Sequence, residues 1–158
     1  MTEHRSQGQH EITELMGVWF SSLGLPRSTG QIFGYLMACD PAEQSAGEIA
    51  GATGMSRASV SSGARMLVQL NAIEERHRVG DRKSYYRLRS GWWVEAATTK
   101  MAGLDRVADE ARRIRAGGGV TRTDGLDELV AFSEFWGEEI PRLRERWERR
   151  RASRKREA

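Results

Sequence analysis

The chain has 158 residues, of which 39% are hydrophobic and five are tryptophan, and this composition excludes a disordered protein. No stretch approaches the roughly 18 apolar residues of a membrane span, and no signal-peptide core is visible. A single cysteine excludes a disulfide framework. We therefore expect a soluble cytoplasmic protein without a membrane partner. The net charge is only +3, but the basic excess is concentrated in residues 41–90 and 141–158, as in a protein that binds a polyanion.

The first predicted helix covers residues 9–23. Its apolar residues recur at steps of three and four, which is the pattern of an amphipathic helix, and Gly24 and Pro26 end it. The apolar stripe consists of Ile12, Leu15, Met16, Trp19, Phe20 and Leu23.

Two capping boxes mark the beginnings of the next two helices. Ser28 and Gln31 predict a helix that ends before residues 40–41, and Ser45 and Glu48 predict a short third helix. In each box, the two side chains satisfy backbone N–H groups that would otherwise have no partner at the helix start.

Residues 45–70 have the pattern of a helix-turn-helix. Ala50 is the small residue needed where two helices cross, and Gly54 can take a positive φ in the tight turn. Ser56 is the predicted N-cap of the helix that follows. The inward side of this helix consists of Val60, Ala64 and Leu67, with Ile49 as the matching residue on the helix before.

The outward face of this helix has the composition of a DNA recognition helix. It combines two arginines, which can read guanine edges, with short side chains that let a helix enter the major groove. No acidic residue occurs between Ser56 and Leu70, where a carboxylate would repel phosphate. We therefore predict DNA contacts from Ser56, Arg57, Ala58, Ser59, Ser61, Ser62, Arg65 and Gln69.

A β-hairpin is predicted directly after this helix. Residues 73–79 and 84–88 have the composition of two short strands, and Gly80-Asp81 is typical of a two-residue turn. Arg78, Arg82 and Lys83 cluster at its tip, where a basic wing would follow phosphates or enter the minor groove. An ordinary exposed hairpin is the alternative, which the position next to the helix pair disfavours.

The C-terminal part is predicted to be helical. One long helix capped by Ser90 covers residues 90–116, and the three glycines at 117–119 end it. A last helix begins at Thr123 or Asp124, and Pro141 inside it should cause a kink. The arginine-rich end is predicted to be frayed, with an extra phosphate contact as the alternative.

Two apolar helix faces, one near each end of the chain, exceed what one small core can cover. We predict that they bury each other across the two-fold axis of a homodimer, and the alternative is that both cover an intramolecular core. The predicted interface consists of Ile12, Leu15, Trp19, Leu129, Phe132, Trp136, Ile140, Leu143 and Trp147.

Residues 54–61, 67–70, 73–74 and 80–86 resemble the GbsR branch of the MarR-type regulators. Leu25-Pro26-Arg27 with Gly30, Ile32 and Gly34, and also Trp92-Trp93, are similar to that branch, so the likeness covers about residues 24–95. It implies a dimeric winged-helix repressor or activator whose N- and C-terminal helices interlock. It further implies that Arg57, Ser59, Ser61 and Ser62 lie on the DNA-reading helix, and Arg82 and Lys83 on the wing.

Some members of that branch respond to choline-like molecules, which makes Trp92 and Trp93 candidates for an aromatic effector pocket. The alternative is core packing, which is the commoner use of tryptophan.

Cys39 is either a redox sensor or, as we favour, a packing residue. No metal-ligand spacing, phosphate loop or nucleophile motif occurs, so we expect no cofactor, no metal and no catalytic residue; the chain should not be an enzyme.

These observations predict a mainly α protein with a short β-hairpin wing. The expected parts are an N-terminal dimerisation helix (1–24), a winged helix-turn-helix DNA-binding domain (25–90), long dimerisation helices (91–150) and a disordered basic tail (151–158). We expect a repressor that binds double-stranded DNA as a homodimer. Its operator should be pseudo-palindromic, with half-site centres roughly 10 bp apart, and a small-molecule effector should release the repressor from it. The alternative is a winged-helix protein–protein interaction module without specific DNA binding.

Overall fold

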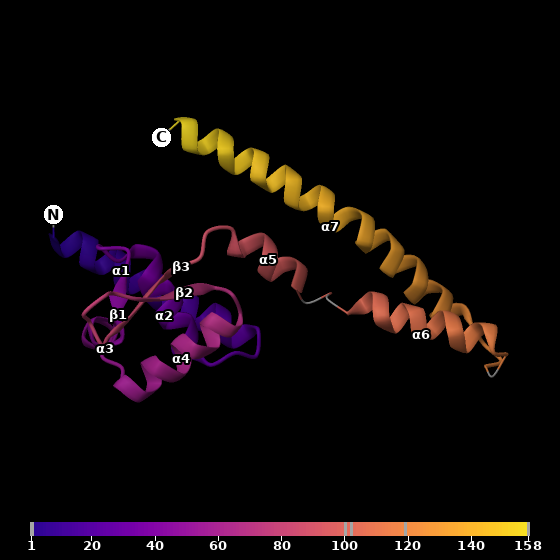
Figure 1. The fold of residues 1–158 in the computed structure, drawn as a ribbon, viewed down its shortest axis with the longest axis horizontal. Helices are drawn as coiled ribbons and strands as arrows, with labels where there is room; N and C mark the ends of the chain where they lie inside the picture. Colours follow the sequence, from indigo (N-terminus) through magenta and orange to yellow (C-terminus); the bar gives the residue numbers. More distant parts are fainter. Residues whose placement is uncertain (1, 100, 102, 119, 158) are drawn as a thin grey trace. The chain divides into compact units, whose positions relative to one another are not determined.

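The chain divides into two compact units, Met1–Trp92 and Trp93–Ala158, in a computed structural model that describes residues 2–99, 101, 103–118 and 120–157 (Figure 1). The first unit contains α1 (Thr2–Ser22), α2 (Arg27–Ala38), β1 (Gln44–Ser45), α3 (Ala46–Thr53), α4 (Arg57–Gln69), β2 (Ile73–His77) and β3 (Ser84–Leu88). The helices α5 (Trp92–Thr99), α6 (Leu104–Ala116) and α7 (Asp124–Glu157) follow. The mainly helical fold with a β-wing is confirmed.

The first unit holds a small antiparallel sheet with the strand order β1-β3-β2. The hairpin of β2 and β3 is confirmed, but β1, which pairs Ser45 with Tyr85, was not predicted, because two residues are too few to show an alternating pattern.

The predicted two-residue turn is wrong. His77 pairs with Ser84, so the loop comprises residues 78–83. A turn forms inside this loop, where the Asp81 N–H donates to the Arg78 carbonyl at 3.1 Å around Gly80, whose φ is 83°.

Helices α1 and α2 approach each other backbone to backbone. A Cβ atom at Gly30 would overlap the Met16 carbonyl oxygen and lie 2.7 Å from the Cβ of Phe20. A Cβ atom at Gly34 would lie 2.7 Å from the Ile12 carbonyl oxygen. Because real Cβ atoms need well over 3 Å, only glycine permits this close packing.

The same helix α2 also supports α4. A Cβ atom at Gly63 of α4 would lie 2.5 Å from the Cδ1 atom of Ile32, so a third glycine leaves room for this core side chain. The largest fully buried side chains of this core are Phe20, Phe33, Ile32, Ile49, Leu67 and Val60.

The capping box predicted at Ser28 and Gln31 is wrong. Helix α2 begins at Arg27, and its N-cap is Pro26, which makes no side-chain hydrogen bond. The Gln31 amide instead donates to the Glu14 carboxylate of α1 at 2.7 Å. The side chain that would complete the capping box therefore forms a contact between two helices.

The single long helix predicted over residues 90–116 is also wrong. The structure has α5 and α6 in its place, and Gly103 precedes α6 with a φ of 91°, which no helix continues through. Helix α6 ends at Ala116, as the three glycines at 117–119 predict. Residue 119 lies outside the described residues.

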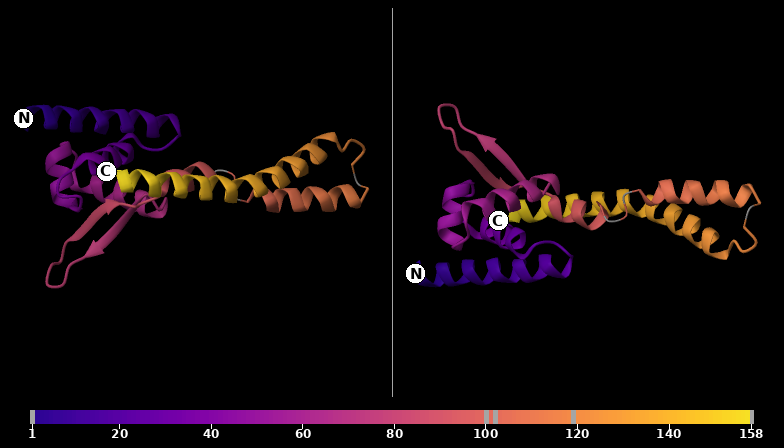
Figure 2. Two further views of the ribbon diagram at one scale, coloured as in Figure 1. Left: turned by 90° about the horizontal axis from the view of Figure 1, so that it is seen from above. Right: turned by 90° about the horizontal axis from the view of Figure 1, so that it is seen from below.

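The second unit is built on the packing of α6 against α7. Ala108 and Ala111 are buried, and Arg112 pairs with Glu134 at 2.8 Å. Helix α7 begins at Asp124 as predicted, contains Pro141, and changes direction along its length (Figure 2). It continues as helix over residues 151–157, where the sequence predicts a disordered tail. Among the described residues, no helix is both long and apolar enough to cross a bilayer.

The α1–α2 contact predicts that Gly30→Ala lowers the free energy of unfolding by about 1–3 kcal/mol, because the new methyl group must displace backbone. The control Gly51→Ala adds a methyl group where no atom lies within 4 Å, and it should stabilise α3 by about 0.5–1 kcal/mol. Denaturant unfolding of the full chain, followed by circular dichroism, measures both. Equal effects of the two substitutions would contradict the close packing.

Candidate nucleic-acid interface

Helix α3 is held at both ends by the groups that the sequence predicts. The Glu48 N–H donates to the Ser45 hydroxyl at 3.3 Å, and the Ser45 N–H donates to the Glu48 carboxylate at 2.7 Å. At the other end, Gly54 has a φ of 71° and its N–H donates to the Ala50 carbonyl at 3.0 Å. The predicted capping box and the predicted turn between the two helices are therefore confirmed.

Helix α4 presents its predicted outward face to solvent. Its N-cap Ser56 accepts a hydrogen bond from the Ser59 N–H at 3.1 Å, as predicted. The predicted inward side is buried together with Gly63. The exposed residues include every predicted DNA contact on this helix and its cap: Ser56, Arg57, Ala58, Ser59, Ser61, Ser62, Arg65 and Gln69.

The wing loop also presents two exposed cations, Arg82 and Lys83. The Asp81 carboxylate accepts hydrogen bonds from the Tyr85 hydroxyl at 2.8 Å and from the Lys83 N–H at 3.0 Å. These bonds lower the pKa of Asp81. The third predicted cation of the wing, Arg78, lies with its guanidinium carbon 3.7 Å from the centre of the Tyr85 ring.

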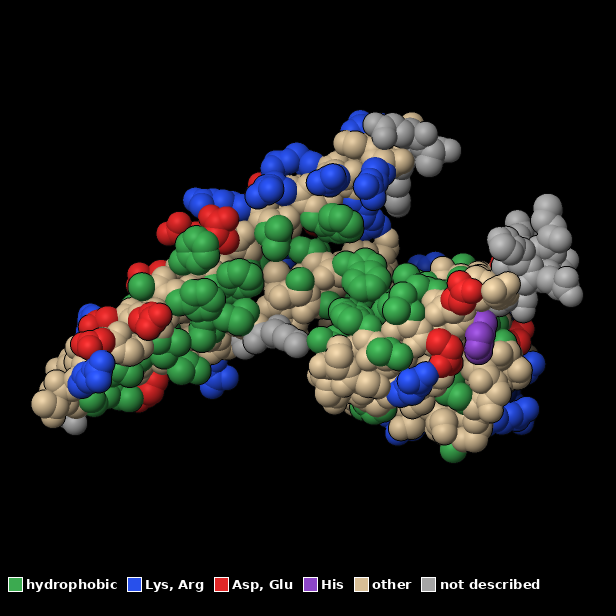
Figure 3. Space-filling view, turned by 180° about the vertical axis from the view of Figure 1, so that it is seen from behind, with side chains coloured by type: hydrophobic (Ala, Val, Ile, Leu, Met, Phe, Trp, Pro, Cys, Tyr) green, Lys and Arg blue, Asp and Glu red, His purple; other side chains and the backbone are tan. Residues whose placement is uncertain are grey.

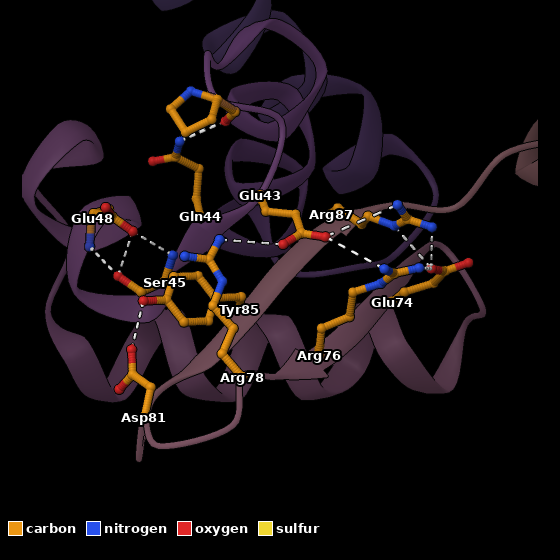
Figure 4. Close-up of polar contacts among 11 residues, drawn as sticks. Glu43, Gln44, Ser45, Glu48, Glu74, Arg76, Arg78, Asp81, Tyr85 and Arg87 are labelled. Carbon is orange, nitrogen blue, oxygen red and sulfur yellow. Dashed lines mark hydrogen bonds and ion pairs between the residues drawn. The ribbon is translucent and has the colours of Figure 1, made fainter.

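The arginines of β2 and β3, and Arg78 directly after β2, pair with acidic neighbours (Figure 4). Glu43, just before β1, lies 3.3 Å from Arg78, 3.7 Å from Arg76 and 4.0 Å from Arg87. Glu74 lies 2.9 Å from Arg87 and 3.3 Å from Arg76.

Four other cations have a different environment. Within the part of the chain that the structure describes, none of Arg57, Arg65, Arg82 and Lys83 forms an ion pair. They are the cations that the sequence assigns to the recognition helix and to the wing tip.

A cleft of about 420 Å³ joins α3, α4 and the wing. It brings together three of the predicted DNA contacts, Arg57, Ser61 and Lys83. The remaining lining residues are Ser45, Ala46, Gly47, Glu48 and Ser84, which sequence reasoning did not assign to the site. The pairing of β1 with β3 places the start of α3 beside the wing, and this pairing has no local signal in the sequence.

The effector pocket predicted at Trp92 needs correction. The Trp92 side chain is 6% exposed, its ring centre lies 4.7 Å from that of Phe33, and its indole N–H donates to the Leu70 carbonyl at 3.1 Å. It therefore belongs to the core of the first unit. Trp93 is 43% exposed, and its part in a pocket stays a prediction.

Cys39 is half-buried, and burial raises the pKa of its thiol, which suits packing better than redox chemistry. No group of three or more His, Cys, Asp or Glu side chains in the described residues could hold a metal ion.

The residues predicted for the dimer interface are exposed or half-buried in the single chain. Leu15 is 62% exposed, Phe132 45% and Leu143 41%. Trp19 is also exposed, whereas Ile12, Leu129, Trp136, Ile140 and Trp147 are half-buried. Hydrophobic side chains gather along one face of the α6–α7 pair (Figure 3). Three further apolar side chains, Val18, Val107 and Phe135, are more than half exposed and were not singled out from the sequence.

Comparisons with known proteins give a consistent result. No family model matches the chain. The HTH-type transcriptional regulator MmpR5 of Mycobacterium tuberculosis (strain ATCC 25618 / H37Rv) is 36% identical over 130 residues, which cover 78% of this chain and 79% of that protein. A crystal structure of a transcriptional regulator superposes with a TM-score of 0.74 at 30% identity, covering 89% of this chain and 98% of the other. Both are regulators, which confirms that the chain is not an enzyme.

The capping box predicts a pH dependence of stability. The Ser45 hydroxyl and N–H both donate to Glu48 and lower its pKa in the folded chain. The ionised form therefore stabilises the fold above the unfolded pKa of about 4.3, and this stabilisation is lost as the pH falls through the folded pKa. Glu48→Gln should lower the Tm at neutral pH, and the difference from the parent should shrink in acid.

Thermal unfolding of both proteins between neutral pH and about pH 3 measures this difference. Ser45→Ala is the matched control, because it removes the hydroxyl donor to the same carboxylate and should reduce the same acid dependence. A difference that stays constant with pH would contradict this role of Glu48.

Proposed function

Because this chain belongs to the HTH-type transcriptional regulators, we propose that it binds a specific sequence of double-stranded DNA as a homodimer and represses transcription there. The observation that carries the proposal is the grouping of four cations without an ion pair on α4 and the wing tip. Glu43 and Glu74 neutralise the arginines of the sheet, whereas the four cations of α4 and the wing tip have no carboxylate partner among the described residues. Such cations can bind phosphate without first losing an intramolecular partner.

The proposed binding mode follows from the shape of α4. Its exposed face carries alanine, serine, glutamine and two arginines, so it is narrow enough to enter the major groove. Arg57 and Arg65 would read guanine edges, and the serine hydroxyls would bind bases or phosphates. Arg82 and Lys83 would follow the backbone or the minor groove beside it.

The homodimer is supported by exposed apolar surface in both units. Leu15 and Trp19 of α1, and Phe132 and Leu143 of α7, are exposed in the single chain. Apolar faces of this kind mark interaction sites, and a second copy of the same chain is the simplest partner. Two recognition helices related by a two-fold axis would occupy half-sites with centres roughly 10 bp apart.

The motifs at residues 54–61 and 80–86 further support assignment to the GbsR branch of the MarR-type regulators. In this assignment, a small molecule that binds the DNA-free form of the dimer more tightly would release the operator.

Selection of bound sequences from random duplex DNA tests the function directly. We expect the full-length protein to enrich an inverted repeat whose half-sites lie roughly one helical turn apart. Enrichment of a single half-site would contradict the homodimer. The absence of any enriched sequence would instead favour a winged-helix module that binds protein.

The recognition helix predicts that Arg57→Ala and Arg65→Ala each relax sequence preference. Loss of a bidentate arginine–guanine contact should reduce discrimination at one base pair by about 1–3 kcal/mol. Electrophoretic shifts with the selected duplex and its single-base variants measure this loss. Arg113→Ala, which removes an exposed arginine from α6, is the control and should keep the parent preference.

The wing predicts a different effect for Arg82→Ala and Lys83→Ala. Each variant should bind all duplexes more weakly, because a phosphate contact carries no sequence information. The slope of log affinity against log salt concentration should become less steep by about 0.9 for each phosphate that the variant no longer neutralises. A variant with the parent slope would show that its side chain does not bind phosphate.

A further inference from the structure

The three cations at the wing have two different environments. Arg82 and Lys83 are exposed and without an ion pair in the described part of the chain, whereas Arg78 is engaged on two sides. One guanidinium nitrogen of Arg78 lies 3.3 Å from the Glu43 carboxylate, and the guanidinium carbon lies 3.7 Å from the Tyr85 ring centre. A phosphate that bound Arg78 would therefore compete with the Glu43 carboxylate for the same guanidinium.

The contacts of Arg78 continue through Tyr85 into the loop (Figure 4). The Tyr85 side chain is buried, and its hydroxyl donates to one oxygen of Asp81 at 2.8 Å. The other oxygen of Asp81 accepts from the backbone N–H of Lys83 at 3.0 Å. A continuous chain of contacts, which we call the wing brace, therefore joins Glu43, Arg78, Tyr85, Asp81 and the Lys83 backbone.

The first member of the wing brace is itself fixed. Glu43 precedes β1, and its carboxylate also lies 3.7 Å from Arg76 of β2 and 4.0 Å from Arg87 of β3. The wing brace thus connects the sheet to a loop whose β-ladder ends at the pair of His77 and Ser84. Backbone order beyond that pair depends on other contacts.

We propose that Arg78 is a positioning residue, which orders the wing loop so that Arg82 and Lys83 are presented to DNA, and that it does not itself bind phosphate. This inference rests on the proposed function. Ordering a flexible loop costs conformational entropy for each residue, and a loop that is ordered before binding avoids that loss of affinity. As free charges, Glu43 and Asp81 would repel DNA. In this proposal they instead hold the loop that carries Arg82 and Lys83, the side chains that bind DNA.

The two possible roles of Arg78 predict opposite results for Glu43→Gln. If Arg78 binds phosphate, removal of the competing carboxylate frees it, so DNA binding should tighten and the salt dependence should steepen. If Arg78 is a positioning residue, the loop loosens and binding to the selected duplex should weaken by about fivefold, the upper end of the effect of removing one partly exposed ion pair. The control Glu74→Gln removes a carboxylate from the same sheet that pairs with Arg87 and Arg76.

A second variant tests the wing brace without changing charge. Tyr85→Phe keeps the ring under Arg78 and removes only the hydroxyl that donates to Asp81. In DNA-free protein, we expect Glu43→Gln and Tyr85→Phe to speed hydrogen exchange of the amides in residues 79–84, whereas Arg82→Ala and Glu74→Gln should leave it unchanged. Circular dichroism and Tm show that each variant is folded.

Binding by Glu43→Gln that is tighter than binding by Glu74→Gln would overturn the proposal. Unchanged exchange in both Glu43→Gln and Tyr85→Phe would also overturn it. Because the exchange measurement needs no DNA, it remains informative if the parent protein selects no sequence, which would be a failure of the proposed function alone.

Discussion

The contact between the backbones of α1 and α2 determines the geometry of the first unit. Gly30 and Gly34 leave no space for a Cβ atom between the two helices, and Gly63 brings α4 close to the other contact surface of α2. Helix α2 therefore lies at the centre, with the proposed recognition helix and the proposed dimer helix packed on it. The orientation of α4 depends on steric contacts that are short and specific, in addition to general apolar burial.

The second organising feature is the distribution of acidic residues in the winged part. Helix α4 contains none, and Glu43, Glu74 and Asp81 are engaged by neighbouring arginines, a hydroxyl or a backbone N–H group. The carboxylates Glu43 and Glu74 pair with Arg76, Arg78 and Arg87, whereas the cations of α4 and the wing tip have no ion pair among the described residues.

The sequence allowed prediction of features that depend on local patterns. The Ser45–Glu48 box, the turn at Gly54 and the buried side of α4 were all predicted, because each depends on neighbours within one or two helical turns. The failures involve distant partners or subtle breaks: Gln31 bonds to Glu14 of another helix, β1 exists only through its pairing with β3, and Gly103 divides a pattern that looks continuous. The dimer and its interface residues stay predictions.

Contacts made by glycine have a further mechanical consequence. Side chains at an interface can change rotamer and absorb a displacement, but Gly30 and Gly34 have no side chain that could do so. A force on Leu15 or Trp19, both exposed on α1, would therefore be transmitted to α2 with little compliance. In the proposed homodimer, a change in the angle between the two copies would therefore change the direction of both α4 helices, without any change in the residues proposed to contact DNA.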